Sequence, residues 1–204
     1  MTKVKLCGLK RRCDIEWANE VRPDYVGFVF AGTKRRVTDD LAKALRRELD
    51  KAIPAVGVFV DEDMAHITRL VADGIIQVVQ LHGHEDERYI QQLRTMVDVP
   101  LIKAFSITTE DDAAKANAAI ADYVLLDNGS GGTGKTFDWS LLTQIERPYF
   151  LAGGLTPDNV SEAMSHHPFA LDVSSGIETD GVKDKAKILQ FMTRVRAASQ
   201  EGTV

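Results

Sequence analysis

Three groups of residues in this sequence have the chemical types that an acid/base reaction on a small anion would need. Cys7 stands before a glycine, Asp127 closes an apolar run, and Arg35 and Arg36 are adjacent. At a cavity, a cysteine thiolate can act as a base or nucleophile, and an aspartate can act as an acid or base if burial raises its pKa. An arginine there can bind a carboxylate through two hydrogen bonds.

Each of these residues also has a purely structural reading. A free cysteine such as Cys7 is often a small buried apolar side chain. Asp127 can cap the loop that follows its strand, and the two arginines can form a solvated basic patch. The choice between the readings depends on whether the fold brings these side chains to one cavity.

Two glycine-containing segments later in the chain have the character of an anion site. Gly153-Gly154 permits close approach of the backbone to a ligand, and Thr156-Pro157 predicts the start of a helix whose free N–H groups face outward. Ser174-Ser175-Gly176 would add hydroxyls and accessible amides, although both segments could be ordinary glycine turns. We predict a phosphate site formed by Gly153, Gly154, Ser175 and Gly176.

The segment GSGGTGKT at 129–136 fits the nucleotide phosphate-loop pattern G-x-x-x-x-G-K-[ST], which would indicate a nucleotide hydrolase or kinase. Such a loop opens a helix, yet FDW at 137–139 and then Pro148 leave little room for one. No acidic strand end stands out as the Mg²⁺ partner, and five β/α units precede the segment. We therefore favour a mobile glycine-rich lid over a barrel mouth.

Eight short apolar, β-branched runs alternate with charged segments of helical period, and these elements must position the reactive groups. The predicted strands cover residues 4–7, 25–30, 55–60, 76–81, 101–105, 123–126, 149–151 and 170–173. The predicted helices cover 12–21, 39–49, a segment capped by Asp61, 86–96, a segment opened by Thr109, 139–145, a segment from 156 and one from about 184. The strands show little polar alternation, which indicates burial on both faces.

Eight β/α units in a chain of 204 residues predict one (β/α)₈ TIM barrel over residues 1–204. A doubly wound parallel sheet has the same local pattern and is the alternative. In a barrel the working groups lie just beyond the carboxyl ends of the strands. The residues at those positions are Cys7, Arg35, Arg36, Asp61, His82, Asp127, Gly153, Gly154, Asp172, Ser174, Ser175 and Gly176.

The composition is that of a globular protein, 44% hydrophobic and 27% charged. A net charge of -5 gives the chain as a whole no attraction to nucleic acid or to an anionic membrane. Its two cysteines are too few for a disulfide framework, and we find neither a signal peptide nor an apolar run of about 18 residues. We expect a cytoplasmic monomer or homodimer whose partner is a small phosphorylated molecule.

Several segments, in this order over nearly the whole chain, resemble the phosphoribosylanthranilate isomerases. They are KLCGL at 5–9, VGFVF at 26–30, VGVFV at 56–60, VQLHG at 79–83, LLDNGSGGTGKTFDW at 125–139, LAGGLTPDNV at 151–160 and DVSSGIE at 172–178. The long glycine loop that ends in FDW is specific to that family. The resemblance implies a barrel enzyme of tryptophan synthesis that converts N-(5-phosphoribosyl)anthranilate into 1-(2-carboxyphenylamino)-1-deoxyribulose 5-phosphate.

The resemblance also implies roles for the matching residues. Asp127 would protonate the ribose ring oxygen, and Cys7 would take the proton from C2′ as a thiolate, for which the site should lower its pKa. Arg36 would bind the anthranilate carboxylate. Because Lys34 stands where the family often has serine, Arg35 is the alternative for that contact.

Asp172 and His82 complete the substrate contacts that the resemblance implies. Asp172 would contact ribose hydroxyls or orient the acid. His82 and His84 are also spaced like a metal-binding pair, but no third ligand has convincing spacing. We therefore expect neither a metal nor a cofactor.

Overall fold

Eight parallel strands close into a barrel, and the computed structural model describes residues 2–128 and 138–201 of the chain. The strands are β1 (Lys3–Cys7), β2 (Tyr25–Val29), β3 (Ala55–Phe59), β4 (Val78–Leu81), β5 (Leu101–Ser106), β6 (Tyr123–Asp127), β7 (Tyr149–Leu151) and β8 (Ala170–Val173). Each strand pairs with the next, and β8 returns to β1 with Asp172 opposite Lys5. The barrel prediction is confirmed, and this closure rules out the doubly wound sheet.

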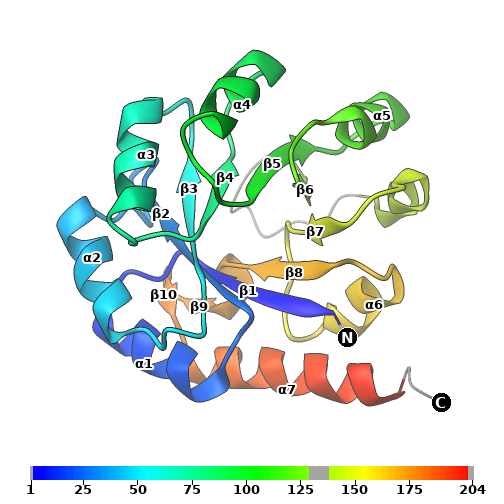
Figure 1. The fold of residues 1–204 in the computed structure, drawn as a ribbon. Coiled ribbons are helices and arrows are strands. Elements are labelled where there is room, and N and C mark those ends of the chain that lie inside the picture. Colours follow the sequence, from blue (N-terminus) through cyan, green and yellow to red (C-terminus); the bar gives the residue numbers. More distant parts are fainter. Residues whose placement is uncertain (1, 129–137, 202–204) are drawn as a thin grey trace.

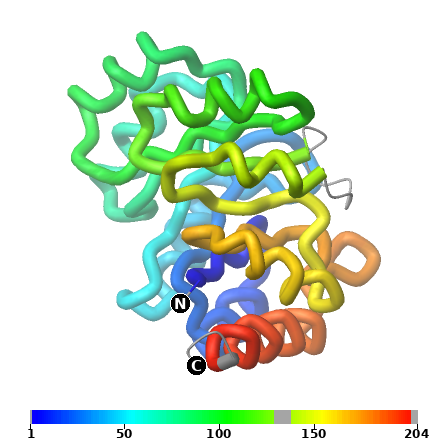
Figure 2. The backbone as a smooth tube through the Cα atoms, turned by 90° about the vertical axis from the view of Figure 1, so that its right-hand side faces the viewer, coloured from blue at the N-terminus to red at the C-terminus, as the bar shows by residue number. Residues whose placement is uncertain are grey.

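Helices form an outer ring around the strands, as Figure 1 shows. They are α1 (Arg12–Val21), α2 (Asp39–Glu48), α3 (Met64–Ala72), α4 (Glu87–Arg94), α5 (Glu110–Ala118), the 3₁₀ helix η1 (Trp139–Gln144), α6 (Val160–Ser165) and α7 (Lys185–Glu201). The last helix, α7, is red in Figures 1 and 2 and packs on both α1 and α6, which completes the ring. None of the helices in the described part of the chain is long and apolar enough to cross a bilayer.

Side chains that alternate along the strands fill two separate apolar cores. The larger core lies between the strands and the helices, where Leu6, Phe28 and Leu126 are fully buried. The smaller core lies inside the barrel and consists of Val56, Val78, Ile102, Leu125, Phe150, Ala152 and Ala170. Gln80, Asp127 and Asp172 come two residues after members of this smaller core. The barrel interior therefore changes from apolar to polar toward the carboxyl ends of the strands.

The starts of α3 and β4 differ from the sequence-based expectation. The cap of α3 is Asp63, whose side chain accepts the N–H of Ala65. Asp61, the expected cap, instead has a left-handed φ of 50° and binds His84. Strand β4 begins at Val78, because residues 75 and 76 still donate their N–H groups back to the end of α3.

A short hairpin that we did not expect follows β8. Its strands are β9 (Glu178–Thr179) and β10 (Val182–Lys183), paired antiparallel. The turn consists of Asp180 and Gly181, which have φ angles of 52° and 77°. A two-residue Asp-Gly turn with both φ angles positive is the connection that best matches the twist of a hairpin.

Candidate active site

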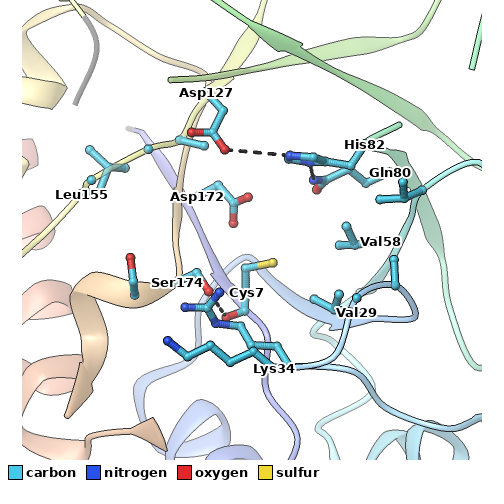
Figure 3. A pocket seen from close by; sticks show the side chains of 18 of the residues that line it. Cys7, Val29, Lys34, Val58, Gln80, His82, Asp127, Leu155, Asp172 and Ser174 are labelled. Atoms are coloured by element: carbon cyan, nitrogen blue, oxygen red, sulfur yellow. Dashed lines mark hydrogen bonds and ion pairs between the residues drawn. The ribbon is translucent and has the colours of Figure 1, made fainter. Parts of the chain in front are cut away.

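A cavity of about 360 Å³ lies at the carboxyl ends of the strands. Nine of the residues predicted at the strand ends line it, namely Cys7, Arg35, His82, Asp127, Gly153, Gly154, Asp172, Ser174 and Ser175. Figure 3 shows Asp127 and His82 directed toward each other and the sulfur of Cys7 directed into the cavity. The volume is in the range of small-molecule sites, so acid, thiol and glycine loops share one ligand-sized space.

Cys7 ends β1 with its thiol beside a fully buried lysine. Lys5 lies two residues earlier on the same face of the strand, and its Nζ is 3.5 Å from Cys7 Sγ. Gly27 of β2 leaves room for both side chains, because a Cβ there would lie 2.7 Å from Sγ. Lys5 also donates to Gln80 Oε1 at 2.5 Å and to Asp172 Oδ2 at 3.0 Å. The candidate base therefore has a buried ammonium group as its neighbour.

The pKa of the Cys7 thiol is raised, which contradicts the lowered value expected from the sequence. Burial is the largest cause and the Asp172 carboxylate adds to it, while Lys5 and Lys183 favour the thiolate without overcoming these two effects. Burial would by itself lower the pKa of Lys5, but Asp172 and Cys7 outweigh burial and raise it. Near neutral pH the sulfur is therefore mostly a thiol with a charged lysine beside it.

Asp127 ends β6 and is only 8% exposed. Its Oδ1 accepts the N–H of Asn128 at 2.7 Å, and its Oδ2 lies 3.8 Å from His82 Nε2. Burial raises the pKa of Asp127, and the charge of Asp172 raises it further against the opposing effects of Asn128 and His82. A carboxyl with a raised pKa holds its proton closer to neutral pH, as a general acid requires.

Asp172 points inward from β8, and one of its carboxylate oxygens is unsatisfied. Oδ2 accepts a hydrogen bond from Lys5, whereas Oδ1 is buried and has no partner within the described residues. Leaving such an oxygen unpaired costs about 1–3 kcal/mol. Because Asp172 lines the cavity, a hydroxyl of a bound sugar would satisfy this oxygen, which supports the expected substrate contact.

The loops after β7 and β8 meet at Gly176, while Gly153 lies against the end of β6. Gly153 and Gly154 have φ angles of 85° and 66°, and a Cβ on Gly153 would lie 2.6 Å from Asp127 Oδ1. A Cβ on Gly176 would lie 1.8 Å from the carbonyl oxygen of Leu155. The two loops are therefore in close backbone contact, although Gly176 itself is not among the lining residues.

The helix after β7 begins later than the sequence suggested. Helix α6 starts at Val160, and the side chain of Asn159 accepts the N–H of Thr156 and donates to the carbonyl of Gly154. The N–H of Thr156 is thus used inside a turn. The expected anion contact from a helix starting at Thr156 is wrong, and the glycine amides remain the candidates together with Ser175, where the 3₁₀ turn η2 (Ser175–Ile177) begins.

The two arginines after β2 have different surroundings. Arg35 lines the cavity, and Glu178 holds its guanidinium at both Nε, 2.7 Å away, and Nη2, 2.9 Å away. Burial would raise the pKa of Glu178, but Arg35 and Lys183 bring it down to about 2. Arg36 is exposed, is not among the lining residues, and makes no side-chain hydrogen bond or ion pair with the part of the chain that the structure describes. Arg35 is therefore occupied by an internal carboxylate.

The histidines do not share a site. His84 binds Asp61 at 2.9 Å, whereas His82 faces Asp127 and takes part in a hydrogen bond with Gln80. Over residues 2–128 and 138–201 no three His, Cys, Asp or Glu side chains are placed to hold a metal ion. The segment 129–136, for which we expected a lid, lies outside the described residues.

Lys5, Gln80 and Lys183 belong to the site but were not expected there from the sequence. On a strand, residues i and i+2 share a face, so Lys5 accompanies Cys7 and Gln80 accompanies His82 into the barrel. Lys183 is brought in by the unexpected hairpin and donates to Ser174, whose hydroxyl donates to the Cys7 carbonyl at 3.1 Å. The strand period and the Asp-Gly turn are the signals that could have identified these residues.

Comparison with known proteins gives consistent matches. A family model described as N-(5'phosphoribosyl)anthranilate (PRA) isomerase matches residues 4–194. The chain is 45% identical over 202 residues to the N-(5'-phosphoribosyl)anthranilate isomerase of Endomicrobium trichonymphae, covering 97% of this chain and 100% of that relative. The fold is similar to that of phosphoribosyl anthranilate isomerase from Thermus thermophilus, with a TM-score of 0.88, 31% identity and coverage of 96% and 99%. Another solved isomerase, in complex with reduced 1-(o-carboxyphenylamino)-1-deoxyribulose 5-phosphate, gives a TM-score of 0.83, 33% identity and coverage of 97% and 100%.

Proposed function

Because the chain belongs to the N-(5'-phosphoribosyl)anthranilate isomerase family, we propose that Asp127 is the acid and Cys7 the base of this reaction. The protein is an isomerase of tryptophan biosynthesis that converts N-(5-phosphoribosyl)anthranilate into 1-(2-carboxyphenylamino)-1-deoxyribulose 5-phosphate. The assignment of its residues rests on one observation: the two groups line the same cavity from β1 and β6. A sugar between them would meet the acid and the base on different sides.

Asp127 begins the reaction in this assignment. Its carboxyl proton goes to the ribose ring oxygen as the C1′–O bond breaks, and the nitrogen lone pair forms the C=N bond of a Schiff base. The carboxylate that remains keeps the hydrogen bond from Asn128 and faces His82. Preorganised donors of this kind stabilise charge that develops during the step.

Cys7 then acts on the opened sugar. Its thiolate takes the proton from C2′, and the electron pair forms the C1′=C2′ bond while the C=N electrons return to nitrogen, which gives an enolamine. Tautomerisation to the ketone loses the hydroxyl proton and adds one at C1′, so no atom is gained or lost overall. The ammonium of Lys5, 3.5 Å from Sγ, balances the charge of the thiolate.

The loss of phosphoribosylanthranilate fluorescence on addition of the purified protein tests this function. We expect turnover without any added metal, nucleotide or cofactor. If the substrate persists while ATP or GTP is hydrolysed, residues 129–136 act as a nucleotide phosphate loop and the isomerase assignment fails.

Arg36 is proposed to bind the anthranilate carboxylate. Arg36→Ala is expected mainly to raise KM, by the equivalent of about 1.5–3 kcal/mol of charge-assisted hydrogen bonding. Arg35→Ala should instead lower the stability by about 1–3 kcal/mol, because it removes one of the two cations that hold Glu178. Steady-state kinetics and thermal unfolding of both variants separate the two roles, and a larger KM effect for Arg35→Ala would reverse the assignment.

Gly153, Gly154, Ser175 and Gly176 are proposed to bind the substrate phosphate. Support comes from the backbone contact between the two loops and from the two positive φ angles. Inorganic phosphate is accordingly expected to compete with the substrate in steady-state assays. An anion bound by residues 129–136 instead would contradict this proposal.

Gly176→Ala is expected to raise the inhibition constant for inorganic phosphate and to destabilise the protein by about 3 kcal/mol, because the added Cβ overlaps the Leu155 carbonyl. Gly74→Ala is the control, since Gly74 has a φ of 68° but no atom of the described chain within 4 Å of the added Cβ. That variant should lose only about 1 kcal/mol from backbone strain and keep the native phosphate affinity. Thermal unfolding and phosphate inhibition of both variants provide the measurements.

We also propose that the enzyme acts in the cytoplasm as a monomer or homodimer, with its phosphorylated substrate as its partner. The absence of a disulfide framework supports a reducing compartment, since Cys7 and Cys13 are both free. Sedimentation of the purified protein would distinguish the two oligomeric states.

A further inference from the structure

We propose that Gln80 is a positioning residue for both the acid and the base of this site. Its one side-chain amide orients His82, which faces the acid, and Lys5, which contacts the base. Gln80 lies on β4 with 1% exposure, between Lys5 on one side and His82 on the other. Lys5 contacts Cys7, and His82 faces Asp127. The inference rests on the proposed roles of Cys7 and Asp127.

The orientation of the Gln80 amide follows from its lysine neighbour. A lysine ammonium can only donate hydrogen bonds, so the atom of Gln80 that lies 2.5 Å from Lys5 Nζ must be the oxygen, Oε1. The amide nitrogen, Nε2, then faces His82 Nδ1 at 2.9 Å. The opposite orientation would set two donors against each other in a buried place where water could not relieve them.

This orientation decides which nitrogen of His82 carries the proton. Because Nε2 of Gln80 donates, Nδ1 of His82 must accept, and the single proton of the neutral ring lies on its Nε2. That N–H faces Asp127 Oδ2 across 3.8 Å. Burial lowers the pKa of His82, which keeps the ring neutral. His82 can therefore move toward the Asp127 carboxylate as a donor once the acid has given up its proton.

Gln80 also completes the surroundings of the base. The ammonium of Lys5 has three N–H groups, and their partners are Gln80 Oε1, Asp172 Oδ2 and Cys7 Sγ. With all three directions used, the cation is held against the sulfur. Loss of the Gln80 acceptor would leave one buried N–H without a partner and free the ammonium to turn from Cys7.

The test is the tautomer of His82 in the unliganded protein, read from the ring ¹⁵N resonances and assigned by their loss in His82→Asn. In the native protein we expect the proton on Nε2, with Nδ1 unprotonated. Gln80→Glu keeps an acceptor for Lys5 but can no longer donate to His82, so Nδ1 should become protonated. Its kcat should fall about 10- to 100-fold with little change in KM, as when an orienting partner is lost.

Gln77→Leu is the matched control, because among the described residues the side chain of Gln77 bonds only to the backbone of Gly74 and Ala55, outside the active-site cavity. It should leave the His82 resonances and kcat at their native values. A proton on Nδ1 of His82 in the native protein would overturn the inference. A native tautomer or a native kcat in Gln80→Glu would also overturn it. Since the tautomer is read without turnover, a failure here alongside normal native isomerase activity refutes only the role of Gln80.

Discussion

Asp127→Asn is expected to lower kcat about 10²–10⁴-fold and to change KM far less. Asparagine has nearly the same shape and can still lie beside His82, but it has no carboxyl proton to give to the ribose ring oxygen. Asp127 is 8% exposed, so bulk water has little access to replace it as the proton donor. Steady-state kinetics, followed by the loss of substrate fluorescence, measure both constants.

The pH dependence of the same variant gives a sharper test. The active form requires a protonated Asp127 and an ionised Cys7, and the pKa of each is raised. Native kcat should therefore fall at acid pH, where both groups are protonated, and at alkaline pH, where both are ionised. In Asp127→Asn only the thiol titrates, so the residual kcat should rise with pH and show no fall on the alkaline side.

Asp158→Asn is the matched control, because the side chain of Asp158 is 84% exposed, pairs with Arg194 and does not line the cavity. It should retain the native kcat and the native bell-shaped profile. A near-native kcat in Asp127→Asn, or a residual activity that still falls at alkaline pH, would assign the acid to another group.

Cys7→Ser is expected to lower kcat by a similar factor, about 10²–10⁴, again with little effect on KM. Serine keeps the shape of the side chain and can still lie beside Lys5, but its hydroxyl is far too weak an acid to supply an anionic base. Burial already raises the pKa of the Cys7 thiol, so the ammonium of Lys5 would not ionise the hydroxyl. Steady-state kinetics and thermal unfolding of the variant separate the loss of the base from a loss of stability.

Cys13→Ser is the control for this variant. Cys13 lies on α1, half-buried, with its sulfur 3.9 Å from Asp14 and outside the cavity. Its replacement should leave kcat unchanged. If Cys7→Ser turns over at a near-native rate, Cys7 is a packing residue and the base must be sought elsewhere in the cavity.

The strands, and with them the position of Cys7 and Asp127 at strand ends, could be predicted from the sequence, because both depend on patterns between neighbouring residues; the count of eight units favoured the barrel over a doubly wound sheet. Runs such as YVGFV at 25–29 and AVGVF at 55–59 are apolar at successive positions, which indicates strands covered on both faces. The end of such a run marks the working edge of a barrel. Cys7 and Asp127 could thus be assigned to the mouth without knowledge of their neighbours.

The surroundings of Arg35 and the start of α6 depended on specific partners that outweighed a local preference. Arg35 was the alternative to Arg36 for the carboxylate contact in the sequence, yet Glu178, 143 residues away, occupies it. The turn closed by Asn159 delays α6 beyond Thr156, although a Thr-Pro pair by itself favours a helix start there. Glu178 is too distant in the sequence to be inferred as the partner of Arg35, whereas Asn159 is local and acts by forming a turn that competes with the helix start.

The protonation states of the site were decided only by the tertiary structure. The base role expected for Cys7 required a lowered thiol pKa, but closure of the barrel places Asp172, 167 residues from Lys5, against the Lys5 ammonium and buries the sulfur. Burial and charge act through space, over every group that packs around an atom, whereas a sequence pattern reports only its neighbours along the chain. The sequence by itself therefore determined which groups could react. The folded barrel decided the charge state of each group in the unliganded protein.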